Sequence, residues 1–101
     1  MGVTSEASPD GKMLTIRIEG RFDFSMHQAF RNAYERIKEK PEVFTIDLHK
    51  ATYLDSSALG MLLLLRDHAG GEQAQVTIAK PNSDVNKILA ISNFNKLFKI
   101  T

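Results

Sequence analysis

Residues 52–68 read TYLDSSALGMLLLLRDH, in which a short polar segment leads into a long apolar run. Asp55, Ser56 and Ser57 carry side-chain oxygens that can accept hydrogen bonds from the free backbone N–H groups at a helix start. The run that follows predicts a helix from Asp55 to about Ala69, and two glycines then end it. The stretch therefore predicts a helix with a strongly polar first turn.

The apolar run contains more leucines than one buried helix stripe requires. Successive residues of a helix are turned by about 100°, so the run divides into two sides. A helix needs one apolar stripe to pack on a sheet, and Leu63 and Leu64 fall outside it, beside Ser56. Either another segment of the chain covers these two leucines or a partner protein binds them. The predicted core side holds Ala58, Leu59, Met61, Leu62, Leu65 and Ala69, and the opposite side holds Ser56, Gly60, Leu63, Leu64 and Asp67.

The segments around this helix predict alternating strands and helices. Lys12–Glu19 alternates apolar and polar residues with a period of two, which is typical of a strand with one buried face. The turn residues before it, Ser-Pro-Asp-Gly, allow Val3–Ala7 to pair back as a short first strand. The other predictions are a helix at Ser25–Lys40 that Ser25 caps, with Lys38 and Lys40 near its end and Pro41 after it; strands at Val43–Leu48 and Gln75–Ala79; a link at Thr52–Leu54; a helix opened by Pro81-Asn82-Ser83 with Val85, Ile88, Leu89 and Ile91 inward; and a tail at Phe94–Thr101 that fits a short helix or an edge strand.

Strands joined by helices through short connections predict an α/β domain. The first hairpin is antiparallel, whereas the strand-helix-strand units are right-handed parallel crossovers. The sheet is therefore expected to be mixed and mostly parallel. With 101 residues, 43% hydrophobic and 25% charged, the chain is expected to form a single domain over residues 1–101.

The composition argues against several classes of partner. A net charge of +1, with no run of Lys or Arg, gives no footprint for nucleic acid or for an anionic membrane. The longest apolar stretch, Ala58–Leu65, is far shorter than the roughly 20 residues of a membrane-spanning helix. The absence of cysteine is compatible with a reducing compartment. We therefore expect a cytoplasmic protein that binds neither nucleic acid nor membrane.

Patterns typical of catalytic and cofactor sites are missing. His27, His49 and His68 are too scattered to form a metal motif, and no glycine-rich phosphate loop is present. Neither serine after Asp55 lies in a Gly-x-Ser-x-Gly nucleophile turn. We therefore expect no enzyme activity, no metal and no cofactor.

One alternative uses the carboxylates near the strand ends. Asp23, Asp47 and Asp55 could belong to an aspartyl-phosphate receiver domain. The strand Lys12–Glu19, however, lacks the adjacent acidic pair that would hold Mg²⁺ at its end. The receiver interpretation stays open as the weaker one.

A phosphate group on Ser56 is compatible with the predicted helix start. The free N–H groups and the partial positive charge of a helix N-terminus stabilise anions. The phosphate would add a charge of about −1.5 to −2 beside Asp55. The sequence therefore predicts a surface switch, in which phosphorylation changes the local charge and leaves the helix folded.

Two motifs carry a resemblance to a known family. Residues 55–60, DSSALG, resemble the signature Asp-Ser-(Ser/Thr)-(Gly/Ala)-Leu-Gly of STAS domains, which are named for sulphate transporters and anti-sigma factor antagonists. Residues 20–23, GRFD, resemble the Gly-x-(Leu/Phe)-Asp that follows the main strand of the family. Ala58 departs from the more common glycine, but it keeps the position small. The resemblance covers nearly the whole chain and implies the STAS fold, a mixed, mostly parallel sheet with a single layer of helices against it.

A STAS domain of this size without a membrane segment resembles bacterial anti-sigma factor antagonists. The resemblance implies that Ser56 is phosphorylated by a partner that is both anti-sigma factor and serine kinase. It implies that the unphosphorylated form binds this partner, that phosphorylation releases it, and that a PP2C-type phosphatase resets the cycle. A scaffold or regulator of another signalling protein, without a switch, is the alternative within the family.

The partner surface expected from the helical pattern and the resemblance includes the loop after the main strand. Asp23 and Phe24 extend it if Phe24 is exposed, and the alternative buries Phe24 in the core. The free protein is expected to be a monomer. The predicted partner-binding residues are Asp23, Phe24, Asp55, Ser56, Ser57, Gly60, Leu63, Leu64 and Asp67.

Overall fold

One five-stranded sheet runs through the computed structural model, which describes residues 2–37 and 40–101. The strands lie in sequence order, β1-β2-β3-β4-β5. β1 is antiparallel to β2, and every other neighbouring pair is parallel. The predicted mixed, mostly parallel sheet is confirmed. The elements are β1 (Gly2–Ala7), β2 (Met13–Phe22), the 3₁₀ turn η1 (Phe24–Met26), α1 (His27–Glu35), β3 (Val43–Leu54), α2 (Ser56–Ala69), η2 (Gly71–Gln73), β4 (Val76–Ala79), α3 (Ser83–Ile91), η3 (Phe94–Lys96) and β5 (Lys99–Ile100).

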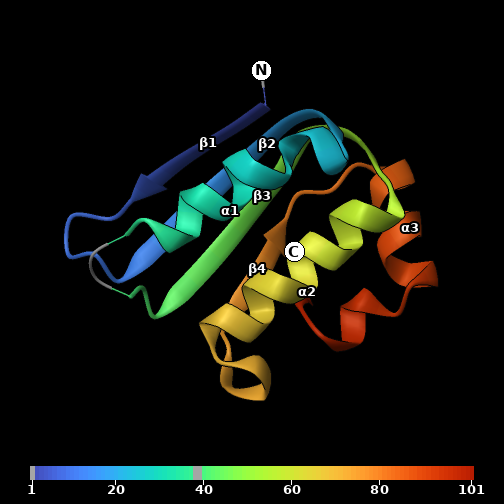
Figure 1. The fold of residues 1–101 in the computed structure, drawn as a ribbon. Coiled ribbons are helices and arrows are strands. Elements are labelled where there is room, and N and C mark those ends of the chain that lie inside the picture. The colour runs from blue at the N-terminus through green and yellow to red at the C-terminus, as the bar shows by residue number, and fades with distance from the viewer. Residues whose placement is uncertain (1, 38–39) are drawn as a thin grey trace.

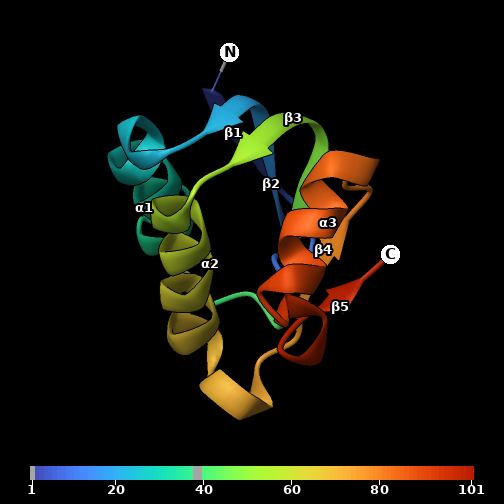
Figure 2. The same ribbon diagram turned by 90° about the vertical axis from the view of Figure 1, so that its right-hand side faces the viewer.

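The helices α1, α2 and α3 cover one face of this sheet (Figures 1 and 2). Each parallel crossover is right-handed and moves one strand further in the same direction, so successive helices stay on the same side. In β2, Leu14 and Ile16 are buried under the helices, whereas Arg17 lies on the face without helices and is exposed. The expected single layer of helices is confirmed.

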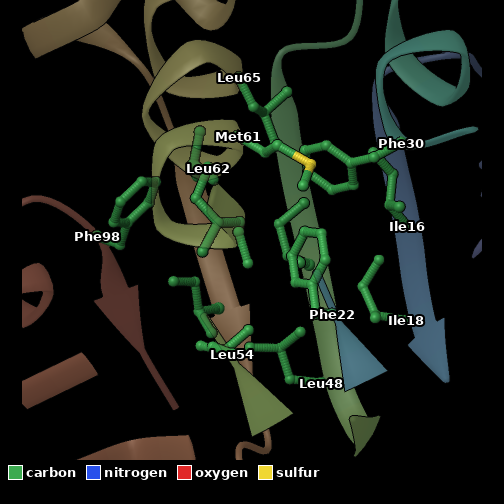
Figure 3. Close-up of a cluster of buried hydrophobic side chains, with 14 of the residues drawn as sticks. Ile16, Ile18, Phe22, Phe30, Leu48, Leu54, Met61, Leu62, Leu65 and Phe98 are labelled. Carbon is green, nitrogen blue, oxygen red and sulfur yellow. The ribbon is translucent and has the colours of Figure 1, made fainter. Parts of the chain in front are cut away.

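The core fills the space between the helices and the covered face of the sheet (Figure 3). Phe22 from β2 and Phe30 from α1 have ring centroids 5.2 Å apart. Met61 and Leu62 of α2 reach down into this cluster, and Phe98 closes it on the β5 side. This core fixes α2 against the sheet and therefore fixes the direction in which its outer side faces.

Both central strands are longer than predicted. β3 continues to Leu54, so the predicted link at Thr52–Leu54 belongs to the strand. The register between β2 and β3 shifts after Arg17 and again after Gly20. These shifts interrupt the alternation of buried and exposed residues along the strands. The sequence pattern therefore did not reveal that β3 continues to Leu54, which is buried.

The first helix is shorter than predicted. α1 ends at Glu35, not at Lys40, and Lys38 lies outside the described residues. Its start also differs, because α1 begins at His27, after Met26, which makes no side-chain cap hydrogen bond. Ser25 lies inside the preceding 3₁₀ turn η1, which Asp23 caps by accepting a hydrogen bond from Ser25 N. Ser25 is therefore not the N-cap.

The structure tests the predictions for α3 and for the tail that follows it. Val85 and Leu89 of α3 are buried as predicted, but Ile91 is 82% exposed, because it lies about 200° around the helix from Leu89. The tail contains both predicted alternatives, a 3₁₀ turn followed by a two-residue edge strand. No described helix has the length and apolar character needed to cross a bilayer.

Candidate functional site

The candidate site lies where β2 and β3 end side by side. Phe22 and Leu54, the last residues of the two strands, are paired in the parallel register. The backbone N–H of Asp55 donates to the carbonyl oxygen of Phe22 at 3.4 Å. The loop after β2 and the first turn of α2 are therefore held next to each other.

Asp55 caps α2. Its backbone is extended, with φ −103° and ψ −178°, and its Oδ1 accepts from Ala58 N at 2.9 Å and from Ser57 Oγ at 2.6 Å. The hydrogen bond from Ser57, followed by that from the Ala58 N–H, lowers the pKa of the Asp55 carboxyl, and the charge of Arg21 adds a smaller effect. Asp55 is therefore a carboxylate near neutral pH.

The two serines have different environments. Ser57 is partly buried, and its hydroxyl donates to Asp55. Ser56 is the first residue of α2, it is exposed, and no described residue forms a hydrogen bond with its hydroxyl. A modifying enzyme can therefore reach Ser56 without disturbing the cap, whereas modification of Ser57 would remove the hydrogen bond to Asp55.

The loop after β2 has a related arrangement, in which an aspartate again accepts from the serine two residues later. Asp23 caps η1 and accepts hydrogen bonds from both Ser25 N, at 3.0 Å, and Ser25 Oγ. Phe24 therefore occupies in this Asp-x-Ser cap the position that Ser56 occupies in the neighbouring one. Phe24 is 66% exposed and stacks on His27, with ring centroids 5.1 Å apart. The alternative that buried Phe24 in the core is wrong.

The outer side of α2 carries the two predicted surplus leucines. Leu63 is 38% and Leu64 is 56% exposed, so no other described segment buries either of them. Ser56 and Asp67 are exposed on the same side, and Gly60 is half-buried. The predicted division of the helix is confirmed, while the partner-binding role of these residues stays a prediction. On the inner side Ala58, Met61, Leu62 and Leu65 are buried, and Leu59 and Ala69 are partly buried against the core.

Gly60 is a glycine that the fold itself does not require. It lies in the second turn of α2, and a Cβ atom built there would meet nothing within 4 Å. A glycine inside a helix is destabilising relative to alanine by about 0.5–1 kcal/mol. The absence of a side chain at Gly60 leaves room for another molecule to approach the helix backbone closely.

Arg21 is a neighbour of the site that the sequence patterns did not single out. Its Nε lies 3.6 Å from Asp23 Oδ2, and its guanidinium carbon lies 4.4 Å from the centre of the Tyr53 ring. Only the register of β2 against β3 pairs Arg21 with Tyr53. The sequence does not show this register, so it could not predict that Arg21 lies close to Asp55.

The receiver interpretation is wrong. Receiver domains have the doubly wound strand order 2-1-3-4-5, whereas this sheet follows the sequence order and has an antiparallel edge. Asp23 and Asp55 are caps, and Asp47 accepts a hydrogen bond from His49 N at the register shift in β3. Within residues 2–37 and 40–101, no three His, Cys, Asp or Glu side chains are grouped so that they could hold a metal ion.

A family model described as "Mlab, STAS domain" matches residues 6–100. The chain belongs to the STAS domain family. A STAS-domain containing protein of Pseudomonas aeruginosa (strain UCBPP-PA14) is 62% identical to this STAS domain over 101 residues, which is 100% of both chains. The family expected from the two sequence motifs is confirmed.

Solved structures agree with this assignment. The anti-sigma factor antagonist SpoIIAA in its unphosphorylated form superimposes with a TM-score of 0.76 at 14% identity, over 99% of this STAS domain and 87% of SpoIIAA. The phosphorylated form of Bacillus SpoIIAA gives 0.74, also at 14% identity, over 99% and 91% of the two chains. At this identity the likeness concerns the fold. The STAS domain of an antisigma-factor antagonist from Rhodobacter sphaeroides is 32% identical, with a TM-score of 0.56, over 76% of this domain and 83% of that chain.

Proposed function

We propose that this STAS domain is an anti-sigma factor antagonist whose binding is switched at Ser56. The unphosphorylated form binds an anti-sigma factor that is also a serine kinase, and so frees the sigma factor in the cytoplasm. Phosphorylation of Ser56 ends the binding, and a PP2C-type phosphatase restores it. The domain acts as a binding module and a phosphorylation substrate, and the catalytic steps belong to its partners.

The observation that carries this proposal is the accessible Ser56 beside exposed apolar side chains. We define the docking surface as Ser56, Gly60, Leu63, Leu64 and Asp67 of α2, with the adjoining Asp23, Phe24, Asp55 and Ser57. Phe24 and Leu64 are its most exposed large apolar residues, at 66% and 56%. Apolar side chains of this kind are typical anchors at protein interfaces. The similarity to the Rhodobacter sphaeroides antagonist supports a partner of the anti-sigma class.

The charges around Ser56 explain how phosphate would end the binding. Asp55 is ionised directly before Ser56, and Asp23 lies on the neighbouring strand end. A phosphoserine adds about −1.5 to −2 charges there at neutral pH. Bringing an apolar partner surface over this group would require its desolvation, and an acidic partner face would also repel it. The cap of α2 does not use the Ser56 hydroxyl, so the helix can stay folded.

The switch is tested with two substitutions at Ser56. We expect Ser56→Ala to bind the anti-sigma partner from the host with unchanged affinity in the presence of ATP, when the wild-type protein is phosphorylated and released. We expect Ser56→Asp to bind at least tenfold more weakly, because it places one permanent negative charge at the edge of the surface. Calorimetry with the purified partner measures both affinities, and Ser83→Ala, at the exposed first residue of α3, serves as the matched control.

Equal affinity of the two Ser56 variants would contradict the switch. Intact-mass measurement and phosphopeptide mapping of the protein purified from its host provide the second readout. Phosphate at Ser56 is the expected result. A STAS scaffold that holds partners together without a switch would carry none under any growth condition.

A further inference from the structure

Arg21 lies near the end of β2, next to the first turn of α2. Phe22, the last residue of β2, accepts a hydrogen bond from Asp55 N at 3.4 Å. The end of β2 is therefore held directly beside the residue that precedes Ser56. The pKa of the Asp55 carboxyl is lowered first by the hydrogen bond from Ser57, and the charge of Arg21 adds a smaller effect. A cation thus lies beside the serine of the proposed switch.

The Arg21 side chain is held only by weak contacts. It is 63% exposed, and its Nε lies 3.6 Å from Asp23 Oδ2, which is longer than a hydrogen bond. Its guanidinium carbon lies 4.4 Å from the centre of the Tyr53 ring, which is itself exposed. An exposed ion pair and an exposed cation–π contact are both weak. Arg21 can therefore leave these contacts for a partner that binds it more strongly.

The cap at Asp23 does not depend on Arg21. Ser25 N and Ser25 Oγ both donate to Oδ1 of Asp23, whereas Arg21 approaches Oδ2. If Arg21 moved away, these two hydrogen bonds would remain and η1 would stay capped. The local charge would change instead, because the Asp23 carboxylate would lose its positive neighbour.

A phosphate group on Ser56 would bind Arg21 more strongly than Asp23 does. It carries about −1.5 to −2 charges at neutral pH and three acceptor oxygens, and the N–H groups of arginine bind phosphate oxygens in pairs. Ser56 is exposed, and no described residue forms a hydrogen bond with its hydroxyl, so nothing described holds a phosphate away from Arg21. The ionised Asp55 repels such a phosphate, and a cation would offset that repulsion.

We propose that Arg21 is the counter-ion of phosphorylated Ser56, and that it leaves Asp23 and Tyr53 to bind the phosphate. This inference rests on the proposed phosphorylation of Ser56 and names the residue that receives the phosphate group. Phosphorylation then changes the docking surface in two places. It adds charge at Ser56, and it removes the positive neighbour of Asp23.

The test uses the full chain with phosphoserine incorporated at position 56 during translation, so that no kinase from the host is needed. The Nε–H group of each arginine gives its own signal in a ¹H–¹⁵N NMR spectrum, and the Arg21→Gln variant assigns that of Arg21. We expect the Arg21 signal to shift between the unphosphorylated and the phosphorylated protein by more than any other arginine signal. An Arg21 signal that stays in place would overturn the proposal.

The proton affinity of the phosphate group provides the second readout. A cation beside the phosphate stabilises its dianion and lowers its pKa, so Arg21→Gln should raise that pKa. We expect the phosphate of this variant to bind its proton at least threefold more tightly, as measured by ³¹P NMR during a pH titration. Arg17→Gln removes the same charge at an exposed position of the same strand, and this matched control should leave the proton affinity unchanged.

His27, which stacks on Phe24 of the docking surface, is the rival cation. An effect of His27→Gln as large as that of Arg21→Gln would overturn the proposal, as would equal effects of Arg21→Gln and Arg17→Gln. Asp23 and Asp55 are retained in every variant, so their charges do not affect the comparison, and thermal unfolding verifies that the variants are folded. Absence of phosphate from Ser56 in the host would contradict the proposed function alone, so the two failures are distinguishable.

Discussion

Neighbouring residues at the start of α2 differ in whether the fold uses their side chains. Asp55 and Ser57 hold the first turn through their mutual hydrogen bond, and Ser56 between them takes no part in it. The sequence shows three residues that could each cap a helix. Only the hydrogen-bond geometry shows that Asp55 is the cap and that the Ser57 hydroxyl donates to it, and sequence spacing does not determine which hydroxyl points inward.

The cap predicts a pH dependence. Because the pKa of Asp55 is lowered in the folded protein, its carboxylate contributes stability at neutral pH that is lost as the pH falls through the folded pKa, below the ordinary value of 3.8. We expect the difference in unfolding free energy between wild type and Asp55→Ala to shrink as the pH is lowered from 6 to about 3. Urea unfolding across this range measures it. A difference that stays constant with pH would mean that the carboxylate charge is not involved.

Gly60 provides a second prediction at this scale. Gly60→Ala should raise the free energy of unfolding by about 0.5–1 kcal/mol, since alanine favours the helix and its Cβ meets nothing in the fold. We also expect weaker binding of the anti-sigma partner, because the added methyl group lies on the docking surface. Ala29→Gly, at an exposed position of α1, is the matched control and should lower stability without changing partner affinity. A Gly60→Ala protein that binds as well as wild type would remove Gly60 from the surface.

Among the elements, α2 is the one whose two sides were best predicted from the sequence. Its polar first turn and two terminal glycines fix its length, and the angular positions of its leucines separate the buried from the exposed ones. The prediction that Ile91 faces inward was wrong, because Ile91 lies about 200° around α3 from the buried Leu89. The predicted length of β3 was also wrong, since the register shift against β2 after Arg17 interrupts the alternation of buried and exposed residues.

Leu62 and Leu64 allow the two sides of α2 to be tested separately. Leu64→Glu should abolish partner binding with little change in stability, because this side chain is 56% exposed. Leu62→Ala should instead cost about 2–5 kcal/mol of stability, because Leu62 is fully buried. Chemical denaturation and partner calorimetry on both variants provide the comparison. Unfolding of Leu64→Glu would show that Leu64 belongs to the core.

At the scale of the whole molecule, the order of the strands determines which parts are most strongly held. β2 and β3 are paired on both sides, whereas β1 and β5 have one neighbour each. The layer arrangement was predictable, because alternating strands and helices permit few topologies. The exposure of Phe24 was not, since it depends on how two chain segments far apart in sequence meet at the sheet edge.

This order predicts a gradient of hydrogen exchange. The amides of Ile16 in β2 and Ile46 in β3 should exchange only through global unfolding, and those of Thr4 in β1 and Thr101 after β5 should exchange at least tenfold faster through local opening at the edges. Native-state exchange at low urea concentrations measures the rates. Equal protection of edge and centre would indicate that the sheet opens as one unit.

The face of the sheet without helices offers a place for a probe. The chain has no cysteine, so Thr4→Cys would introduce a single thiol on β1, where Thr4 is exposed and pairs with Arg17 of that same face. A fluorophore attached there would lie on the face of the sheet opposite α2. The labelled protein could then report partner binding by anisotropy, with the docking surface chemically unaltered.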